Sequence, residues 1–221
     1  DYILTKELGK KISIFKLIEN SWTINSLNNL IGFAGLVDVG LRYSYFSDEE
    51  QEGKTMKGIS KVMPYFMSGL SLLSFVSLLL LFSHDKNSTL KTYSFVLVLA
   101  SLILPALLFL STRKRLDYFG NLSKKKILAL ICTSLLDWLF VSGFFFYVGR
   151  VLGYNISFVN ILPLYCISIC VGIVSMIPGS LGSFDLIMIG GLLHLSLNHN
   201  EAASWLLLFR IFYYFIPFFI G

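Results

Sequence analysis

Long stretches without a charged residue constrain the fold of this chain more than any other feature. Met63 to Phe82 is a run of 20 residues without a charge, and a helix of that length crosses a hydrocarbon layer roughly 30 Å thick. Further apolar runs cover Tyr93–Leu110, Ile127–Val148, Ile156–Ile177, Leu186–Leu197 and Ala202–Gly221. The runs are unbroken and do not alternate as barrel strands do, so they favour helices. We predict an all-α fold, a polytopic transmembrane helical bundle with broken or re-entrant helices.

Composition supports this class. Hydrophobic residues make up 55% of the chain and charged residues 14%, whereas a soluble domain carries roughly 25% charged residues. The net charge of +5 is concentrated in a few loops, which points to topology and anionic lipid headgroups rather than to nucleic acid. We expect residues 1–221 to form a single transmembrane domain, an excerpt of a longer chain because it starts without methionine.

Motifs of catalysis and metal binding are missing from the sequence. Cys132, Cys166 and Cys170 lie in apolar runs without metal-ligand spacing, so they are expected to be small apolar side chains. We find no acyl-transfer triad, no phosphate-binding glycine loop and no paired acids at hydrolase spacing. No catalytic residue, metal or cofactor is therefore predicted for this segment.

A helix break is predicted in the segment from Ser175 to Asp185, between two apolar runs. Pro178 removes a backbone donor and disfavours helix at the residue before it, while Gly179 and Gly182 admit conformations closed to other residues. Transporters use such breaks to aim helix ends at a substrate. A plain loop between two spanning helices, with Asp185 as a helix cap, is the alternative.

The basic loops predict the orientation, because Lys and Arg gather on the cytoplasmic side. The loop from Ser111 to Lys126 is placed inside, and alternation places the loop from Ser47 to Val62 inside as well. If Ile24 to Phe46 crossed fully, the lysines of the lead-in Asp1 to Asn20 would lie outside. A re-entrant hairpin over Ile24 to Phe46 removes this conflict. We also expect the apolar residues between Ile12 and Ile18 to lay an amphipathic helix on the membrane surface.

One constellation occurs twice. Gly32-x-x-Gly35-x-x-Asp38 and Gly179-x-x-Gly182-x-x-Asp185 share their spacing and lie 147 residues apart. Transporters often contain internal repeats with broken helices at corresponding positions, although paired glycines also serve close helix packing. The predicted hinge positions are Gly32, Gly35, Pro178, Gly179 and Gly182.

Five ionisable residues fall within apolar runs: Asp38, Arg42, Asp137, Asp185 and Arg210. Asp137 is the eleventh residue of its run, about 16 Å deep, where a charge costs roughly 2.5–3.5 kcal/mol on insertion scales. It needs a partner, a polar cavity or a proton, and the two arginines are candidate partners. We predict that these five residues bind a lipid headgroup. Interhelical ion pairs that fix packing are the alternative, and Asp38 and Arg42 lie one helical turn apart.

Two motifs carry a resemblance to a known family. One is the Ser175–Asp185 segment followed by Phe209-Arg210 and Ile216-Pro217. The other is Asn28-Asn29-Leu-Ile-Gly-Phe-Ala-Gly35, which ends in Gly40-Leu-Arg42. In order and separation they resemble the membrane domain of the MprF family, the bacterial lysylphosphatidylglycerol synthase/flippases, and the likeness covers nearly the whole chain.

The resemblance implies that these helices translocate aminoacylated phosphatidylglycerol from the inner to the outer leaflet of the bacterial cell membrane, which gives resistance to cationic antimicrobial peptides. It implies polar residues important to flipping at Arg42, Asp137 and Asp185, whereas Asp38 matches no family position. The parent chain would be a phosphatidylglycerol lysyltransferase, and nothing in this segment resembles its cytoplasmic synthase domain.

As a hypothesis, Arg42 and Arg210 hold the headgroup phosphate, and Asp137 and Asp185 hold its ammonium groups. The expected partner is an anionic or aminoacylated phospholipid, with no direct nucleic acid contact; a homodimer is also compatible with the sequence. Two alternatives stay open. The segment could be a transmembrane anchor and scaffold for a lysyltransferase, or it could transport another anionic lipid.

Overall fold

The computed structural model describes residues 1–32, 35–47, 52–83, 91–112 and 122–220. Throughout these ranges the regular structure is helical, which confirms the all-α prediction. Most of the polar segment from Ser83 to Thr92, and the basic residues Arg113, Lys114 and Arg115, lie outside these ranges. The helices are α1 (Tyr2–Leu8), α2 (Ile14–Ile31), α3 (Leu36–Phe46), α4 (Glu52–Val62), η2 (Met63–Met67), α5 (Ser68–Ser83), α7 (Ser94–Ser101), α8 (Ile103–Thr112), α9 (Lys124–Val151), α10 (Phe158–Val174), η4 (Pro178–Ser180), α11 (Ser183–His194), α12 (His199–Arg210), η5 (Ile211–Phe215) and α13 (Ile216–Ile220).

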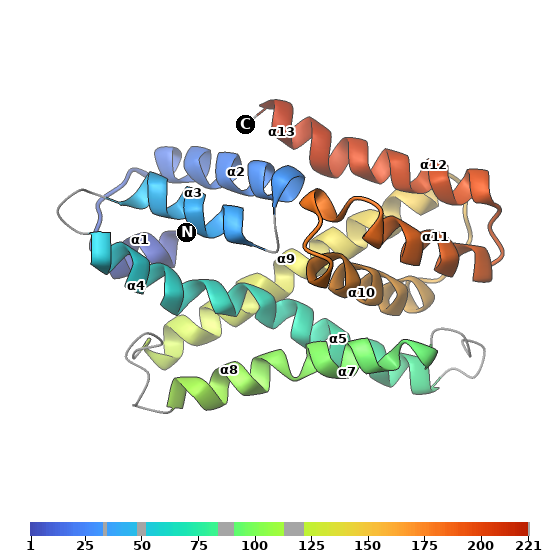
Figure 1. The fold of residues 1–221 in the computed structure, drawn as a ribbon, viewed down its shortest axis with the longest axis horizontal. Coiled ribbons are helices and arrows are strands. Elements are labelled where there is room, and N and C mark those ends of the chain that lie inside the picture. Colours follow the sequence, from blue (N-terminus) through green and yellow to red (C-terminus); the bar gives the residue numbers. More distant parts are fainter. Residues whose placement is uncertain (33–34, 48–51, 84–90, 113–121, 221) are drawn as a thin grey trace.

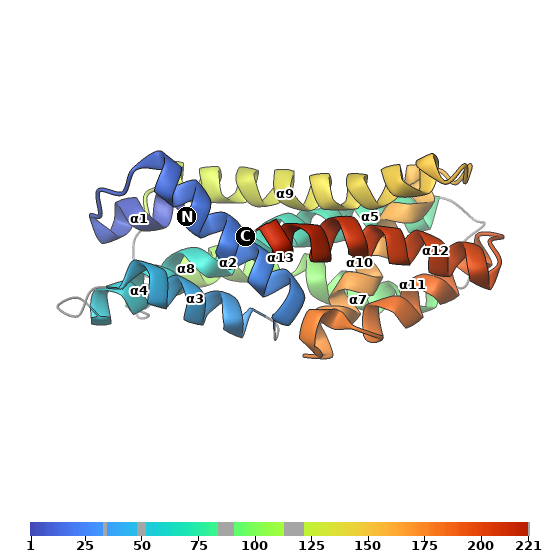
Figure 2. The ribbon, with the colours of Figure 1, turned by 90° about the horizontal axis from the view of Figure 1, so that it is seen from above.

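Helical stretches long and apolar enough to cross a membrane lie along the long axis of the bundle (Figures 1 and 2). Among the described residues there are four: Gly53–Ser83, Ser94–Ser111, Lys124–Val151 and His199–Ile220. They correspond to four of the predicted apolar runs, Met63–Phe82, Tyr93–Leu110, Ile127–Val148 and Ala202–Gly221, so the chain is a multi-pass membrane protein.

Three of these stretches are locally distorted, each near a proline. The 3₁₀ turn η2 contains Pro64. The helix interrupts at Leu102, between α7 and α8 and three residues before Pro105. The π-helical segment η5 precedes Pro217. A proline ring clashes with the carbonyl four residues back and supplies no N–H, so each distortion has a local cause.

The break at η2 is stabilised by α9. The Ser134 hydroxyl donates to the Phe66 carbonyl at 2.7 Å and accepts from the Gly69 amide at 2.9 Å. The Trp138 indole N–H donates to the same carbonyl at 3.0 Å. Backbone groups freed by the 3₁₀ turn are thus satisfied by the neighbouring helix, as an apolar environment requires.

Two helical hairpins enter the bundle from opposite ends (Figures 1 and 2). The helices α2 and α3 run from one end to the middle and back, as predicted for the re-entrant hairpin. The helices α10 and α11 do the same from the other end. This corrects the expectation that Ile156–Ile177 and Leu186–Leu197 span the membrane one after the other, because the chain reverses at η4 halfway along the axis.

The tips of the two hairpins meet. A side chain at Gly179 in η4 would lie 2.8 Å from the Leu30 carbonyl oxygen in the last turn of α2. The segments on either side of this contact lie next to each other in both views (Figures 1 and 2). Only a glycine lets the two backbones approach this closely.

The predicted surface helix between Ile12 and Ile18 is wrong as a separate element. From Ile14 onward these residues are the first turns of α2, the descending arm of the hairpin. Its start is set by Ser13, whose hydroxyl accepts from the Lys16 amide, so the helix begins earlier than hydropathy suggests.

The main hydrophobic core lies at the end of the bundle where α10 starts and α11 finishes. Phe145 on α9 is fully buried and stacks on Trp205 of α12 with ring centroids 5.0 Å apart. The Phe209 ring packs edge-on against Phe145, and these ring centroids are also 5.0 Å apart. The Trp205 N–H donates to the Phe145 carbonyl at 2.8 Å. This aromatic cluster holds α9 against α12. The tip of the α10–α11 hairpin, at η4, lies outside the cluster and borders a cavity.

The close crossing of α5 and α9 yields the first prediction. A methyl group at Gly69 would lie 2.3 Å from the Ser134 carbonyl oxygen, whereas one at Gly143 of α9 would meet open space. We expect Gly69→Ala to destabilise the protein by about 1–3 kcal/mol through overpacking and to lower its thermal midpoint in detergent. Gly143→Ala is the matched control. Equal thermal midpoints for the two variants would show that α5 and α9 do not approach each other closely at Gly69.

Candidate functional site

A cavity of about 890 Å³, lined by both apolar and charged side chains, lies where the two hairpin tips meet α9 and η2. Its size falls within the range of roughly 300–1,000 Å³ that is usual for small-molecule sites. Both hairpins contribute to its wall, through Gly32 and Gly35 on one side and Gly179 and Ser180 on the other. The predicted helix breaks therefore bound a single space.

Arg42 of α3 is the cation of this cavity and is 2% exposed. Its Nε donates to Asp1 Oδ1 at 2.7 Å and its Nη2 to Asn25 Oδ1 at 3.2 Å. Nη1 pairs with the carboxylate of Asp38, one turn earlier on the same helix. The guanidinium also lies over the Phe66 ring, 5.0 Å from its centroid. A buried guanidinium requires such compensation, and here two carboxylates supply it.

Asp137 faces the same cavity from the middle of α9, at the fourteenth of 28 helical residues. Within the described part of the chain its carboxylate makes no hydrogen bond or ion pair, and the side chain is accessible. The expected pairing with Arg42 or Arg210 is not seen, because both arginines have other partners. The cavity thus holds an unpaired carboxylate midway along a membrane-spanning helix.

Asp185 and Arg210 form a bidentate pair just behind the cavity wall. Arg210 Nη2 donates to both carboxylate oxygens at 2.8 Å, and Nε donates to Oδ1 at 3.0 Å. Nη1 donates to the Gly179 carbonyl at 3.4 Å. Neither residue lines the cavity, but Gly179 does. The pair therefore joins α11, α12 and the hairpin tip.

In both copies of the repeated glycine–aspartate motif, the second glycine caps a helix and the aspartate lies in the first turn of that helix. The first glycines differ, with φ of −45° at Gly32 and 57° at Gly179. Gly35 and Gly182 have φ of 87° and 90° and are the N-caps of α3 and α11. Asp38 and Asp185 are each the third residue of the helix, where the dipole favours a negative charge. The positive φ explains the second glycine of the motif. The partners differ, since Arg42 lies on the same helix as Asp38 and Arg210 lies on the helix after Asp185.

Several cavity residues were not singled out from the sequence as site residues. Asp1 and Asn25 contact Arg42, and Tyr213 and Tyr214 reach the cavity from the π-helical segment η5. Asn25 lies near the Asn28-Asn29 pair, an unusual polar cluster in an apolar run and the available signal for it. The tyrosines gave no signal, because their direction depends on the π turn.

The structure therefore brings Asp38, Arg42 and Asp137 into one cavity together with Gly32, Gly35 and Gly179, whereas Pro178 and Gly182 do not line it. It places Asp185 and Arg210 adjacent to that cavity, paired with each other. Among the described ionisable side chains that line the cavity, three carboxylates stand against one guanidinium. Such a site suits a ligand that carries more positive than negative charge.

Comparison with known proteins gives a consistent result. A family model described as the lysylphosphatidylglycerol synthase TM region matches residues 2–221. Phosphatidylglycerol lysyltransferases of Staphylococcus aureus strains MRSA252 and COL are 30% identical over 221 and 224 residues. That of Staphylococcus haemolyticus strain JCSC1435 is 31% identical over 222 residues. Each match covers 98% of this chain and 26% of the relative, so the chain spans about a quarter of the length of these relatives.

The Asp185–Arg210 pair yields a stability prediction. Asp185→Asn leaves the Arg210 guanidinium, 9% exposed, without a carboxylate. Because the Asp185 side chain is partly exposed, the loss should be smaller than the roughly 3–5 kcal/mol for breaking a fully buried pair. We expect a marked fall in the thermal midpoint in detergent, and a smaller fall for the double variant Asp185→Leu/Arg210→Met. Asp137→Asn is the control, because no described partner is lost. If Asp185→Asn and Asp137→Asn lowered the thermal midpoint equally, the Asp185–Arg210 pair would not be a stabilising contact.

Proposed function

The chain belongs to the lysylphosphatidylglycerol synthase transmembrane-region family, and from this premise we propose that it moves aminoacylated phosphatidylglycerol from the inner to the outer leaflet of the bacterial cell membrane. One observation carries the proposal. A cavity bounded by two opposed helix breaks holds three carboxylates, one guanidinium and no other described ionised group. A segment that only anchored an enzyme would gain nothing from such a space.

The charge balance favours a lysylated headgroup. Lysylphosphatidylglycerol carries one phosphate and two ammonium groups, a net charge of +1, whereas unmodified phosphatidylglycerol has a net charge of −1. The cavity has a formal charge of −2 from Asp1, Asp38, Arg42 and Asp137. In a region of low dielectric, like charges at short range are strongly disfavoured. The cationic headgroup therefore fits and the anionic one is repelled.

Arg42 and its carboxylates suggest how the headgroup binds. The guanidinium is enclosed, so an incoming phosphate must replace one of its carboxylates. The phosphate would take two parallel N–H bonds from Arg42, as arginine forms with phosphate. The displaced carboxylate, Asp1 or Asp38, would then pair with one ammonium group, and Asp137 with the other. This exchange raises the number of ion pairs in the cavity from two to four and leaves no charge without a partner.

The hairpins supply the means of alternating access. They enter from opposite ends and meet at Gly179 and Leu30, so a shift of either tip would open the cavity towards one end only. Opposed broken helices that meet at mid-membrane serve this purpose in transporters. Asp185 and Arg210 act in this scheme as positioning residues, because they hold the Gly179 tip. The acyl chains would stay in lipid.

Two wider consequences complete the proposal. Lysylated lipid in the outer leaflet would lower the negative surface charge and weaken the attraction of cationic antimicrobial peptides. The parent chain would be a phosphatidylglycerol lysyltransferase, as its relatives are named, with its catalysis outside this segment. Two functions compete with this proposal: a scaffold role for these helices, and transport of another anionic lipid.

The translocation proposal predicts a loss of lipid movement in two variants. We expect Arg42→Ala and Asp137→Asn to slow transfer of fluorescent lysylphosphatidylglycerol across reconstituted vesicles by about tenfold or more, since each removes a charge-assisted contact. Transfer is measured by quenching the probe from outside with dithionite.

Matched controls separate transport from folding. Arg150→Gln removes an arginine that pairs with Asn155 far from the cavity, and Glu19→Gln removes an exposed carboxylate of α2. Both should transfer lipid at the wild-type rate. Normal transfer by well-folded Arg42→Ala and Asp137→Asn proteins, together with altered assembly with the synthase, would instead establish the scaffold function.

Headgroup selectivity provides a separate prediction. Wild-type protein should transfer lysylphosphatidylglycerol faster than phosphatidylglycerol, and Asp137→Asn should narrow that ratio because one of the three carboxylates is neutralised. Parallel assays with the two fluorescent lipids in identical vesicles measure the ratio. A ratio below one for the wild type would favour transport of an anionic lipid.

A further inference from the structure

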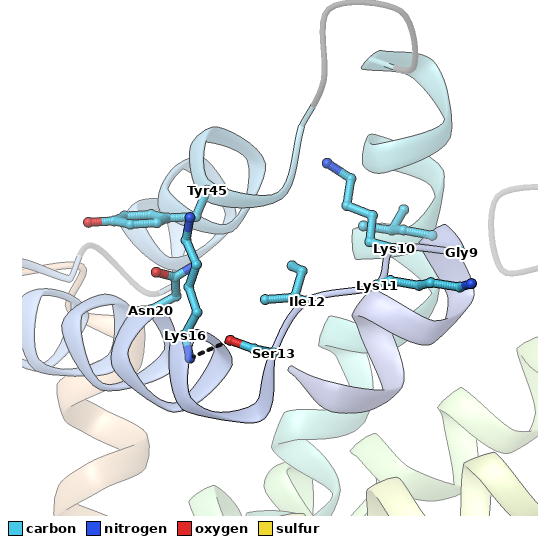
Figure 3. A pocket seen from close by; sticks show the side chains of 9 residues that line it. Gly9, Lys10, Lys11, Ile12, Ser13, Lys16, Asn20 and Tyr45 are labelled. Carbon is cyan, nitrogen blue, oxygen red and sulfur yellow. Dashed lines mark hydrogen bonds between the residues drawn. The ribbon is translucent and has the colours of Figure 1, made fainter.

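A second hollow lies at the base of the α2–α3 hairpin, at the end of the bundle where both hairpin arms begin or end (Figure 3). It encloses about 550 Å³ and is formed by the α1–α2 connection from Leu8 to Ser13, the first turns of α2 and Tyr45 in the last turn of α3. It shares no lining residue with the central cavity. The lysines of the lead-in, of α4 and of the first turn of α9 lie at the same end, so the positive-inside rule predicts that this end is cytoplasmic.

Asn20 is the unusual residue of this hollow. It is only 8% exposed, it lines the hollow, and no described residue forms a hydrogen bond with its carboxamide. A carboxamide offers two N–H donors and one oxygen acceptor, and the tip of this side chain is accessible from the hollow. Its polar end faces the hollow beside Lys16 and Tyr45 (Figure 3). A ligand in the hollow can therefore reach the donors of Asn20.

The surrounding charge is positive. Lys10, Lys11 and Lys16 line the hollow, and none of the described lining residues is acidic. Lys16 lies beside Asn20 and Tyr45, with Lys10 on the opposite side (Figure 3). The N-terminus of α2 adds the positive end of an 18-residue helix dipole. Lys11, Lys16 and this helix end together favour an anion that accepts hydrogen bonds.

Apolar side chains next to the hollow point to a lipid rather than to a free anion. Ile14, Phe15 and Ile18 follow on α2 and are 72%, 81% and 60% exposed. On a multi-pass membrane protein such side chains contact acyl chains, while the lysines reach the headgroup layer. A phosphate and its acyl chains would be recognised side by side.

We propose that this hollow binds the phosphodiester of an anionic phospholipid from the adjacent leaflet. The phosphate oxygens accept hydrogen bonds from the Asn20 carboxamide and the Lys16 ammonium, and the acyl chains lie along Ile14, Phe15 and Ile18. Bound there, the lipid holds the base of the hairpin that carries Asp38 and Arg42. Binding does not depend on translocation, so the site is independent of the proposed function.

The test uses purified full-length protein in nanodiscs with phosphatidylglycerol or phosphatidylcholine probes that carry a diazirine on the upper acyl chain. After irradiation, mass spectrometry quantifies adducts on the peptide that contains Ile14 to Ile18. We expect saturable labelling by the phosphatidylglycerol probe well above that by phosphatidylcholine. Lys16→Gln should weaken it by about fivefold, as expected for one lysine near an anionic surface.

Further variants make the result decisive. Asn20→Asp keeps the shape of the side chain but adds a negative charge, so it should abolish selective labelling. Lys125→Gln changes an exposed lysine of α9 that does not line the hollow and should leave labelling unchanged. Three outcomes would overturn the proposal: equal labelling by both probes, equal effects of Lys16→Gln and Lys125→Gln, or competition by millimolar inorganic phosphate, which would indicate a free-anion site.

Discussion

Backbone groups at a helix break inside a membrane need partners, and this requirement shapes the centre of the molecule. Water is scarce there, so each freed N–H or C=O must be satisfied by protein or must line a wet space. The Gly179 carbonyl receives a bond from Arg210, and the Phe66 carbonyl receives bonds from Ser134 and Trp138. Once these breaks are stable, the helices no longer fill the middle of the bundle. The cavity is the space that remains between the satisfied breaks.

The two copies of the glycine–aspartate motif have diverged in their use of charge. In one copy the aspartate and its arginine lie on the same helix and face the cavity, with a second carboxylate, Asp1, completing the network. In the other copy the arginine comes from a different helix and binds both carboxylate oxygens. The first arrangement has excess negative charge and can exchange partners. The second is balanced and bidentate, so it suits a fixed joint that holds the opposite tip in place.

Much of the architecture was accessible from the sequence, because hydropathy and charge act locally along the chain. The spans, the hairpin over Ile24 to Phe46 and the break at Pro178 follow from uncharged runs, misplaced lysines and helix-breaking residues. The pairing of Asp38 with Arg42 follows from helical spacing. The second hairpin was missed because a 17-residue apolar helix, α10, has nearly the length of a span. Its reversal depends on contact with α2, which lies far away in the sequence.

The arrangement of the site was harder to predict, because it too depends on contacts between residues far apart in the sequence. Asp185 and Arg210 are 25 residues apart and Asp1 and Arg42 are 41 apart, so neither pair has a periodic signature. The tyrosines of η5 reach the cavity only because a π turn rotates them relative to an α-helix, and the sequence shows the proline but not the resulting direction. Asn20 gave no signal at all, since its significance lies in a hydrogen bond that the described residues do not make.

Asp137 connects the stability of the bundle with its function. Its carboxylate lies at the centre of a 28-residue helix, where insertion of a charge costs a few kcal/mol, and no described side chain offsets that cost. Apolar replacements would serve a purely structural helix better, as buried polar groups that lack partners destabilise a fold. The cost is tolerable if the cavity admits water when empty and a cation when occupied. A carboxylate kept available in this way, opposite an arginine that already has its own carboxylates, is what the proposed binding of a lysylated headgroup requires.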